Sequence, residues 1–321
     1  MVRIFKFLVL WYYRNMALVI EKKQIKDWIG KLKKKFIVVD TRKAVLPVKQ
    51  YFLPPQEEIF NFNKKNQRLT ALTDQKNLVI ICYYLDQLEA ITQLDEIMKK
   101  PQPDFFYWQK REKTTLVGLI DESVKAAPGG DIILEKINHR QYQVLILTDN
   151  GKQISKNEFF KEIANPEIRK YPAEENPGKK MLLDSELLAE VVTWSVNHKI
   201  WDELAERCLG CGICTYVCPL CHCFSIEDRV SLTGTECSRC RQWDTCTLPG
   251  FAKIAGGHNF HKTIKERYYN WFYHKFVRAY KEYGKAQCVA CGQCKKYCPA
   301  GIEIGEVLKE IIRDYKIRDC P

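Results

Sequence analysis

The sequence predicts an α+β protein with a mixed α/β N-terminal domain and a mostly helical, cysteine-rich C-terminal domain. Short apolar runs alternate with helical patterns in the first half, which is typical of an α/β or α+β domain. A stretch with three prolines interrupts the middle of the chain. Of the fifteen cysteines only Cys82 precedes position 208, and thirteen lie between 208 and 298. This change in composition marks a domain boundary.

The N-terminal domain is expected to span 16–165, with Met16 as one candidate start. Residues 16–35 carry apolar side chains at helical spacing and predict an amphipathic helix. A second helix is predicted at 86–98. Strands are expected at 36–40, 78–82, 115–120, 132–135 and 142–147. The sequence contains neither GxGxxG nor GxxxxGK[ST], so it indicates no dinucleotide fingerprint and no P-loop.

The prolines Pro166, Pro172 and Pro177 predict a linker over 166–183. The C-terminal domain then spans 184–321. It is expected to begin with a helix over 184–207, with Asp184 as the N-cap, that leads into the first cysteine run. Another helix, rich in aromatic and basic residues, is predicted at 264–283. We expect its aromatic side chains to pack in a core.

Two cysteine runs have the same spacing. Each has the form Cys-x2-Cys-x2-Cys-x3-Cys-Pro, and the second starts 80 positions after the first. The cysteines are Cys208, Cys211, Cys214 and Cys218 in the first run, and Cys288, Cys291, Cys294 and Cys298 in the second. Two-residue gaps let a tight loop turn three sulfurs toward one small volume. This spacing is that of the bacterial ferredoxins, in which the fourth cysteine reaches the other cluster.

The spacing predicts a two-cluster ferredoxin-like core with crossed ligands. One 4Fe-4S cluster would be held by Cys208, Cys211, Cys214 and Cys298, and the other by Cys288, Cys291, Cys294 and Cys218. Structural zinc is the first alternative, but zinc sites use paired knuckles rather than triplets closed by Cys-Pro. Disulfides are the second alternative, and they belong to small secreted domains. The spacing therefore favours iron–sulfur clusters.

A segment at 220–287 is inserted between the two runs, and it brings five further cysteines. These are Cys221, Cys223, Cys237, Cys240 and Cys246. They could form a third metal site, either a further Fe–S cluster or zinc, since Cys237 and Cys240 have the spacing of a metal knuckle. The alternative is that they are free thiols in a tight core. His222 could be a ligand but is expected to be structural.

Composition limits the remaining function classes. The formal net charge is +12, but the basic residues are scattered and no recognition motif accompanies them, so nucleic acid is not expected as a partner. A solvated surface or an acidic redox partner explains the surplus. No apolar run reaches the length of a membrane span, and many unpaired cysteines favour the cytoplasm.

The chain also resembles a known family. The resemblance rests on Cys218–Phe224, Trp243–Cys246, Ala255–Asn259, Arg267 and His274–Phe276, and on the second cysteine run. It is similar to the iron–sulfur β subunit of sulfhydrogenases and to the iron–sulfur subunit of anaerobic sulfite reductases. A weaker similarity extends over 52–60 and 79–104. Cys237 and Cys240 lie outside the family pattern, and with Cys82 alone no cluster is expected in the first domain.

The resemblance implies an electron-transfer subunit of a multi-subunit oxidoreductase. It would relay single electrons between a flavin-bearing partner that oxidises NAD(P)H and a catalytic subunit of the hydrogenase or sulfite/sulfur reductase type, without bond chemistry of its own. One alternative is a reductase with a substrate site in the N-terminal domain, but no nucleophile–base arrangement is visible there. The other is a redox-sensing Fe–S protein.

Overall fold

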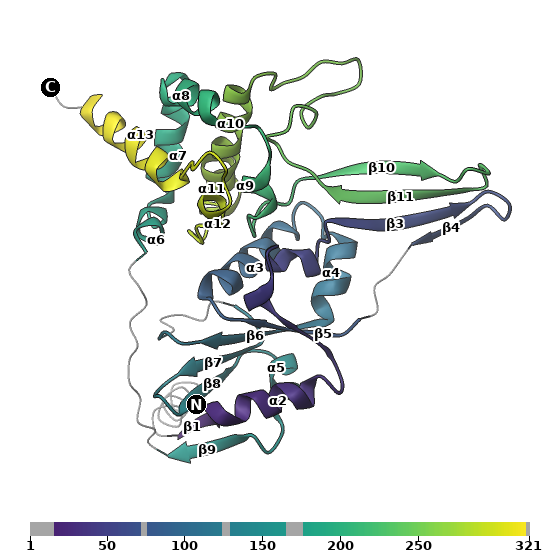
Figure 1. Cartoon of the computed structure of the whole chain (residues 1–321), viewed down its shortest axis with the longest axis vertical. Helices are drawn as coiled ribbons and strands as arrows, with labels where there is room; N and C mark the ends of the chain where they lie inside the picture. Colours follow the sequence, from purple (N-terminus) through teal and green to yellow (C-terminus); the bar gives the residue numbers. More distant parts are fainter. Residues whose placement is uncertain (1–15, 72–75, 124–128, 165–175, 319–321) are drawn as a thin grey trace, which may run out of the picture. The chain divides into compact units, whose positions relative to one another are not determined.

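The computed structural model describes residues 16–71, 76–123, 129–164 and 176–318 (Figure 1). Both helices and sheets are present, as the α+β prediction requires. The chain divides into two compact units, one of residues 1–44 with 74–175 and the other of 45–73 with 176–321. Residues 45–73 thus belong with the C-terminal part. The predicted domain limits, 16–165, 166–183 and 184–321, do not assign residues 45–73 to the C-terminal domain. These limits stay a prediction. Residues 166–175 of the predicted linker lie outside the described residues.

The first unit is built on a seven-stranded mixed sheet. Its order is β2 (Ile37–Asp40), β5 (Leu78–Cys82), β6 (Thr114–Ile120), β7 (Ile132–Lys136), β8 (Gln141–Ile146), β1 (Met16–Glu21) and β9 (Phe160–Ala164). The neighbouring strands β2, β5, β6 and β7 are parallel to one another. The remaining pairs, β7 with β8, β8 with β1 and β1 with β9, are antiparallel. Parallel strands need both faces covered, which explains the unbroken apolar sequence of β5. The helices are α2 (Ile25–Leu32), α3 (Leu85–Ile97), α4 (Phe105–Glu112) and α5 (Asp149–Ser155).

The five predicted strands of this unit and the helix at 86–98 are confirmed within one or two residues. The predicted helix over 16–35 is wrong in its first part. Residues 16–21 form β1, which pairs with β8 on one side and β9 on the other. Ile25, Trp28 and Leu32 do share the buried face of a helix, as the spacing indicated. The apolar residues before them fit both the helical period and the period of a strand. Pairing with two neighbouring strands stabilises the extended form.

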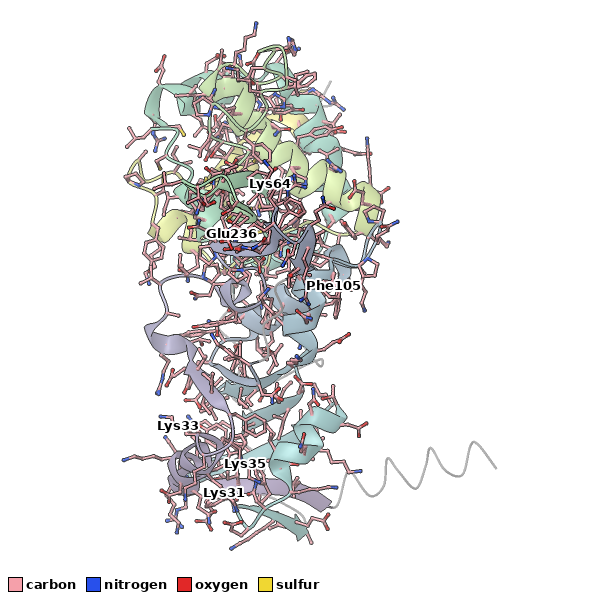
Figure 2. All side chains as sticks on the ribbon, turned by 90° about the vertical axis from the view of Figure 1, so that its right-hand side faces the viewer. Lys31, Lys33, Lys35, Lys64, Phe105 and Glu236 are labelled. Carbon is pink, nitrogen blue, oxygen red and sulfur yellow. The ribbon has the colours of Figure 1, made fainter. Side chains whose placement is uncertain are left out.

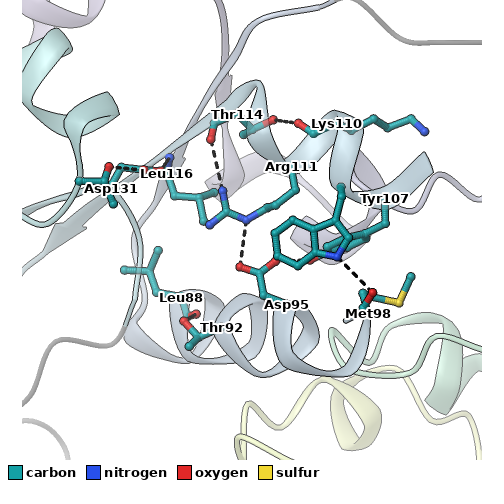
Figure 3. Close-up of polar contacts among 12 residues, drawn as sticks. Leu88, Thr92, Asp95, Met98, Tyr107, Lys110, Arg111, Thr114, Leu116 and Asp131 are labelled. Carbon is teal, nitrogen blue, oxygen red and sulfur yellow. Dashed lines mark hydrogen bonds and ion pairs between the residues drawn. The ribbon is translucent and has the colours of Figure 1, made fainter. Parts of the chain in front are cut away.

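Helices α3 and α4 are tied together by a partly buried polar cluster (Figure 3). Asp95 on α3 accepts from Arg111 Nε at 3.1 Å and from the Tyr107 hydroxyl at 2.6 Å, both on α4. Asp131, before β7, accepts from the backbone N–H of Leu116 at 2.7 Å. These bonds hold the two helices together and fix the backbone of β6 beside β7, so the charged groups that make them have a structural use.

Close packing at Gly151 gives a first testable prediction. A Cβ placed on Gly151, in α5, would lie 2.0 Å from the carbonyl oxygen of Asp131. Gly151→Ala therefore displaces backbone, and we expect it to lower the free energy of unfolding by about 1–3 kcal/mol. Gly30→Ala is the matched control, since Gly30 is exposed in helix α2 with nothing within 4 Å. Gly30→Ala should stabilise by up to about 1 kcal/mol. Urea unfolding of both variants measures the difference, and equal effects would contradict this packing.

The second unit combines a helical core with a four-stranded antiparallel sheet. The sheet has the order β10 (Phe224–Val230), β11 (Glu236–Trp243), β3 (Gln56–Asn63) and β4 (Arg68–Ala71). The helices are α6 (Pro177–Leu182), α7 (Ser185–Trp194), α8 (Ile200–Arg207), α9 (Ile213–Tyr216), α10 (Ile264–Phe272), α11 (Ala279–Tyr283), α12 (Gln293–Lys296) and α13 (Ile304–Arg318). A π-helical turn, Tyr273–Arg278, joins α10 to α11.

The predictions for the helices of this unit are partly confirmed. The helix over 264–283 is confirmed, and Asp184 is an N-cap that accepts from the N–H of Leu187 at 3.0 Å. The single helix over 184–207 is wrong, because a 3-10 turn at Ser195–Asn197 and the extended backbone of His198 divide it into α7 and α8. Part of the predicted linker, Pro177–Leu182, is helix α6. The strands β10 and β11 of the inserted segment were not predicted.

The core of the second unit consists of aromatic and aliphatic side chains from α7, α8, α10 and α13. Trp201, Trp271, Phe272 and Phe276 are all at most 2% exposed. The cysteines Cys208, Cys214, Cys288, Cys294 and Cys298 pack against this cluster. The expectation that the aromatic helix packs in a core is confirmed. The core therefore supports both cysteine runs from one side.

Candidate iron–sulfur centre

The two cysteine runs adopt the same local backbone. Gly210 and Gly212 in the first run have φ of +62° and +75°, and their counterparts Ala290 and Gly292 have +53° and +70°. A short helix follows in each case, α9 in the first run and α12 in the second. A left-handed φ is uncommon for a residue with a Cβ. Ala290 adopts it because the loop must turn there as the first loop does at Gly210.

Backbone N–H groups of these loops point at cysteine sulfurs. The N–H of Gly210 donates to Cys208 Sγ and that of Ala290 to Cys288 Sγ, both at 3.4 Å. A third N–H, from Ile302, donates to Cys298 Sγ at 3.4 Å. Such donors stabilise thiolates and tune the potential of a bound cluster. The equivalent bonds in the two loops indicate that both loops present their sulfurs in the same way.

The first of two cysteine-lined cavities mixes the two runs. Its cysteines are Cys208, Cys211, Cys214, Cys294 and Cys298. The rest of its lining is mostly apolar and includes Tyr268, Trp271 and Ile302. Cys298, the last cysteine of the second run, thus lies with the first three cysteines of the first run. These are the four residues that the sequence predicted to act together.

The second cavity is lined by Cys218, Cys288, Cys291 and Cys294, together with Pro219, Leu220 and Lys275. Cys218, the last cysteine of the first run, lies with the first three of the second. Cys294 lines both cavities, so the cavities are neighbours. Four thiols around a largely apolar space, with N–H donors to their sulfurs, form a donor set that fits a cubane cluster. The ligand roles themselves stay a prediction.

Two lysines are buried beside the second cavity, and sequence reasoning missed both. Lys275 is 3% exposed, and its Nζ donates to Cys218 Sγ at 3.3 Å and to the carbonyl oxygen of Gln287 at 2.9 Å. Lys49 is also 3% exposed; it donates to the carbonyl oxygen of Cys221 and lies 4.4 Å from the ring centroid of Trp243. A buried ammonium requires compensating negative groups. No sequence signal singles out Lys275, because the predicted helix at 264–283 contains several other basic residues.

Burial and the cysteines act in opposite directions on Lys275. Burial alone would lower the pKa of Lys275, but the neighbouring cysteines, Cys218 first, hold that pKa well above its ordinary value. A hydrogen bond with Cys221 and the charges of Lys275 and Lys49 lower the pKa of the Cys218 thiol, against the effect of its burial. Cys218 is therefore predisposed to be a thiolate, which is the form that binds iron.

The other basic side chains are mostly at the surface. Figure 2 labels Lys31, Lys33 and Lys35, around the end of α2, and Lys64, after β3, all of which are exposed. Lys31 pairs with Glu158 at 2.6 Å. Such exposed cations are solvated and contribute little to stability. Within the described residues the contrast with Lys49 and Lys275 is clear, because those two are enclosed next to cysteines.

The five cysteines of the insert do not gather at one point. Cys221 hydrogen-bonds with Cys218, and Cys223 hydrogen-bonds with Cys246. Cys237 and Cys240 lie on β11, three residues apart, so their side chains leave opposite faces of the strand. No group of three or more His, Cys, Asp or Glu side chains within 16–71, 76–123, 129–164 and 176–318 is arranged to hold a single metal ion. A third site of these five cysteines stays a prediction.

His222 has bonding partners other than a metal. Its Nδ1 lies 3.1 Å from the carbonyl oxygen of Leu220 and 3.2 Å from Gln287 Nε2. Burial lowers the pKa of His222. This agrees with the structural role that the sequence favoured. Cys82, at the end of β5, is completely buried, and burial raises the pKa of its thiol to about 12.

Comparison with known proteins agrees with this geometry. Residues 207–302 match the family model of a 4Fe-4S dicluster domain. The chain is also similar to "Sulfhydrogenase 2 subunit beta" of Pyrococcus furiosus, with 29% identity over 289 residues, which cover 85% of each chain. No solved structure matches the chain. Among the described helices, none is long and apolar enough to cross a membrane. We conclude that the chain is an iron–sulfur protein of the electron-transfer kind, with a 4Fe-4S dicluster domain, resembling the β subunit of a sulfhydrogenase.

Proposed function

We propose that the chain holds two 4Fe-4S clusters with crossed ligands and relays single electrons between them. Cys208, Cys211, Cys214 and Cys298 hold the first cluster, and Cys288, Cys291, Cys294 and Cys218 hold the second. The observation that carries this proposal is the composition of the two cavities. Each is lined by the first three cysteines of one run and the last of the other, and Cys294 lines both. Iron–sulfur clusters supply one-electron chemistry, and the protein supplies ligands, burial and hydrogen bonds.

The proposed partners rest on the relative and on the family resemblance of the sequence. Its name describes one subunit of a sulfhydrogenase, so a chain similar over 85% of its length is proposed to work within a complex too. We infer that a flavin-bearing, NAD(P)H-oxidising subunit supplies the electrons, which then pass to a catalytic subunit of the hydrogenase or sulfite/sulfur reductase type. The neighbouring cavities, which share Cys294, provide a short path between two clusters.

Electron relay without catalysis is tested on the isolated, anaerobically purified chain. We expect a reduced low-potential viologen to reduce both clusters, and an oxidant to reoxidise them in one-electron steps. The same preparation should neither evolve hydrogen nor consume sulfite or polysulfide. Sustained turnover of any of these by the isolated chain would instead support a reductase with its own substrate site. Clusters that cannot be reduced and reoxidised without loss of iron would favour a redox sensor.

A further inference from the structure

The two cavities differ in charge although their loops share one backbone. The lining of the first cavity includes no Lys, Arg, Asp or Glu, while that of the second includes Lys275. Lys295 and Lys309 also line the second cavity, but they pair with Glu303 and Glu306 respectively, and their side chains are more than half exposed. Lys275 is the charge that is enclosed. Lys49 is buried as well, but it lines neither cavity, so the asymmetry of the two linings comes from the Lys275 ammonium.

The position of Lys275 directs its charge at one ligand sulfur. Its Nζ lies 3.3 Å from Cys218 Sγ and is held there by the carbonyl oxygen of Gln287 at 2.9 Å. The backbone N–H of Gln287 in turn donates to the carbonyl oxygen of Lys275 at 2.8 Å. Lys275 lies in the π-helical turn Tyr273–Arg278, a distortion that occurs frequently at functional sites. The ammonium is thus fixed by two neighbouring segments and is not free to swing into solvent.

The nearest comparable cation at the first cavity is placed differently. Arg267 is 5% exposed, but its guanidinium donates to the carbonyl oxygens of Thr247, His261 and Lys262, at 3.0, 3.3 and 2.6 Å. Its hydrogen bonds go to the backbone of the insert, although its charge also opposes the rise that burial causes in the pKa of the Cys208 thiol. No described hydrogen bond joins Arg267 to a cysteine sulfur. A cluster in the first cavity would therefore lack a cation in contact with its ligands.

We propose that Lys275 makes the cluster of the second cavity the easier of the two to reduce. Reduction adds one negative charge to a cluster that is already anionic. A buried cation that hydrogen-bonds to a ligand sulfur stabilises the reduced cluster more than the oxidised cluster. Its attraction to the cluster grows with the negative charge of the cluster, and burial reduces the screening of this attraction by solvent. An electron that enters through the first cluster then settles on the second. This inference rests on the crossed two-cluster arrangement proposed above.

The test is a potentiometric titration followed by EPR on the full, anaerobically reconstituted chain. Lys275→Met is compared with Lys275→Arg, which keeps the charge, and with Lys281→Met, which removes an exposed charge from helix α11. We expect two separate one-electron steps in the unmodified chain. Lys275→Met should lower the reduction equilibrium constant of the higher step at least tenfold, which is about 59 mV for one electron. Lys275→Arg should keep the higher step close to its value in the unmodified chain, and Lys281→Met should leave both steps unchanged.

Iron content separates the possible failures. About eight irons in the unmodified chain support the two-cluster proposal, and fewer overturn that proposal and this inference together. With eight irons present, two unchanged steps in Lys275→Met would overturn the inference alone. If Lys275→Met does not retain its clusters, the variants Cys291→Ser and Cys211→Ser, which both keep Lys275, show which cluster gives the higher step. Cys291→Ser should move or remove the higher step and Cys211→Ser the lower one, and the reverse assignment would refute the proposal.

Discussion

Replacing Cys218 and Cys291 together by alanine is expected to remove one cluster and leave about four irons per chain. Both residues line the second cavity. Replacing Cys218 and Cys211 together is expected to damage both clusters and leave little iron, because Cys211 lines the first cavity. Iron analysis with EPR of the reduced protein measures both results. The two variants match in the number and type of residues replaced, so the difference depends only on which cysteines share a cluster.

The opposite result would contradict the crossed assignment. If each run held its own cluster, Cys218 and Cys211 would belong together and their loss would leave four irons. Cys218 and Cys291 would then damage both clusters. Cys237→Ala combined with Cys240→Ala is a further control, because these two lie on strand β11 and line neither cavity. Loss of iron in that variant would show that β11 takes part in a metal site.

The second large effect is expected in the sheet of the same unit. Arg241 on β11 and Glu57 on β3 form an ion pair in which both side chains are at most 10% exposed. Removing one charge of a buried ion pair withdraws the compensation of the other, which costs about 3–5 kcal/mol. We expect Glu57→Gln to lower the stability of the second unit by this amount. Urea unfolding, followed by the fluorescence of tryptophans such as Trp243 on β11, gives the change.

A matched pair exists in the same sheet. Arg239 on β11 contacts Asp228 on β10 at 2.7 Å, with both side chains about half exposed. Asp228→Asn is expected to change stability by about 0–1 kcal/mol. Equal losses for Glu57→Gln and Asp228→Asn would show that burial does not set the strength of these pairs. The double variant Glu57→Gln with Arg241→Met should be more stable than Glu57→Gln alone, because no charge is left unpaired.

The first unit was largely predictable because its strands are apolar on both faces. Residues 78–82 and 115–120 are short apolar runs with several β-branched residues, which favours a buried strand, and both strands are confirmed. Residues 16–21 were assigned to a helix because a run of six residues fits the helical period as well as the period of a strand. Pairing with β8 and β9 makes this segment a strand. Periodicity within one segment contains no information about such partners.

The inserted strands could not be found in the same way. Most residues of β10 are exposed, and the alternation of Phe224 and Ile226 stops at the charged residues 227–229, so the pattern is too short to predict a strand. Its neighbour β11 pairs with β3, more than 170 positions earlier in the chain. The two-cluster ferredoxin rule grouped the cysteines into two crossed sets of four, and each set lies at one cavity, with Cys294 at both. Their roles as ligands stay a prediction. Lys275 was missed because its role depends on contact with Cys218, 57 positions away.

The most direct test of the central claim is the content of iron and acid-labile sulfide in the anaerobically purified chain, with EPR of the reduced state. The two-cluster account predicts about eight of each per chain and two interacting cubane signals. About twelve of each would place a further cluster among the cysteines of the insert. Little iron together with bound zinc would contradict the account, because zinc has no redox chemistry and could not relay electrons.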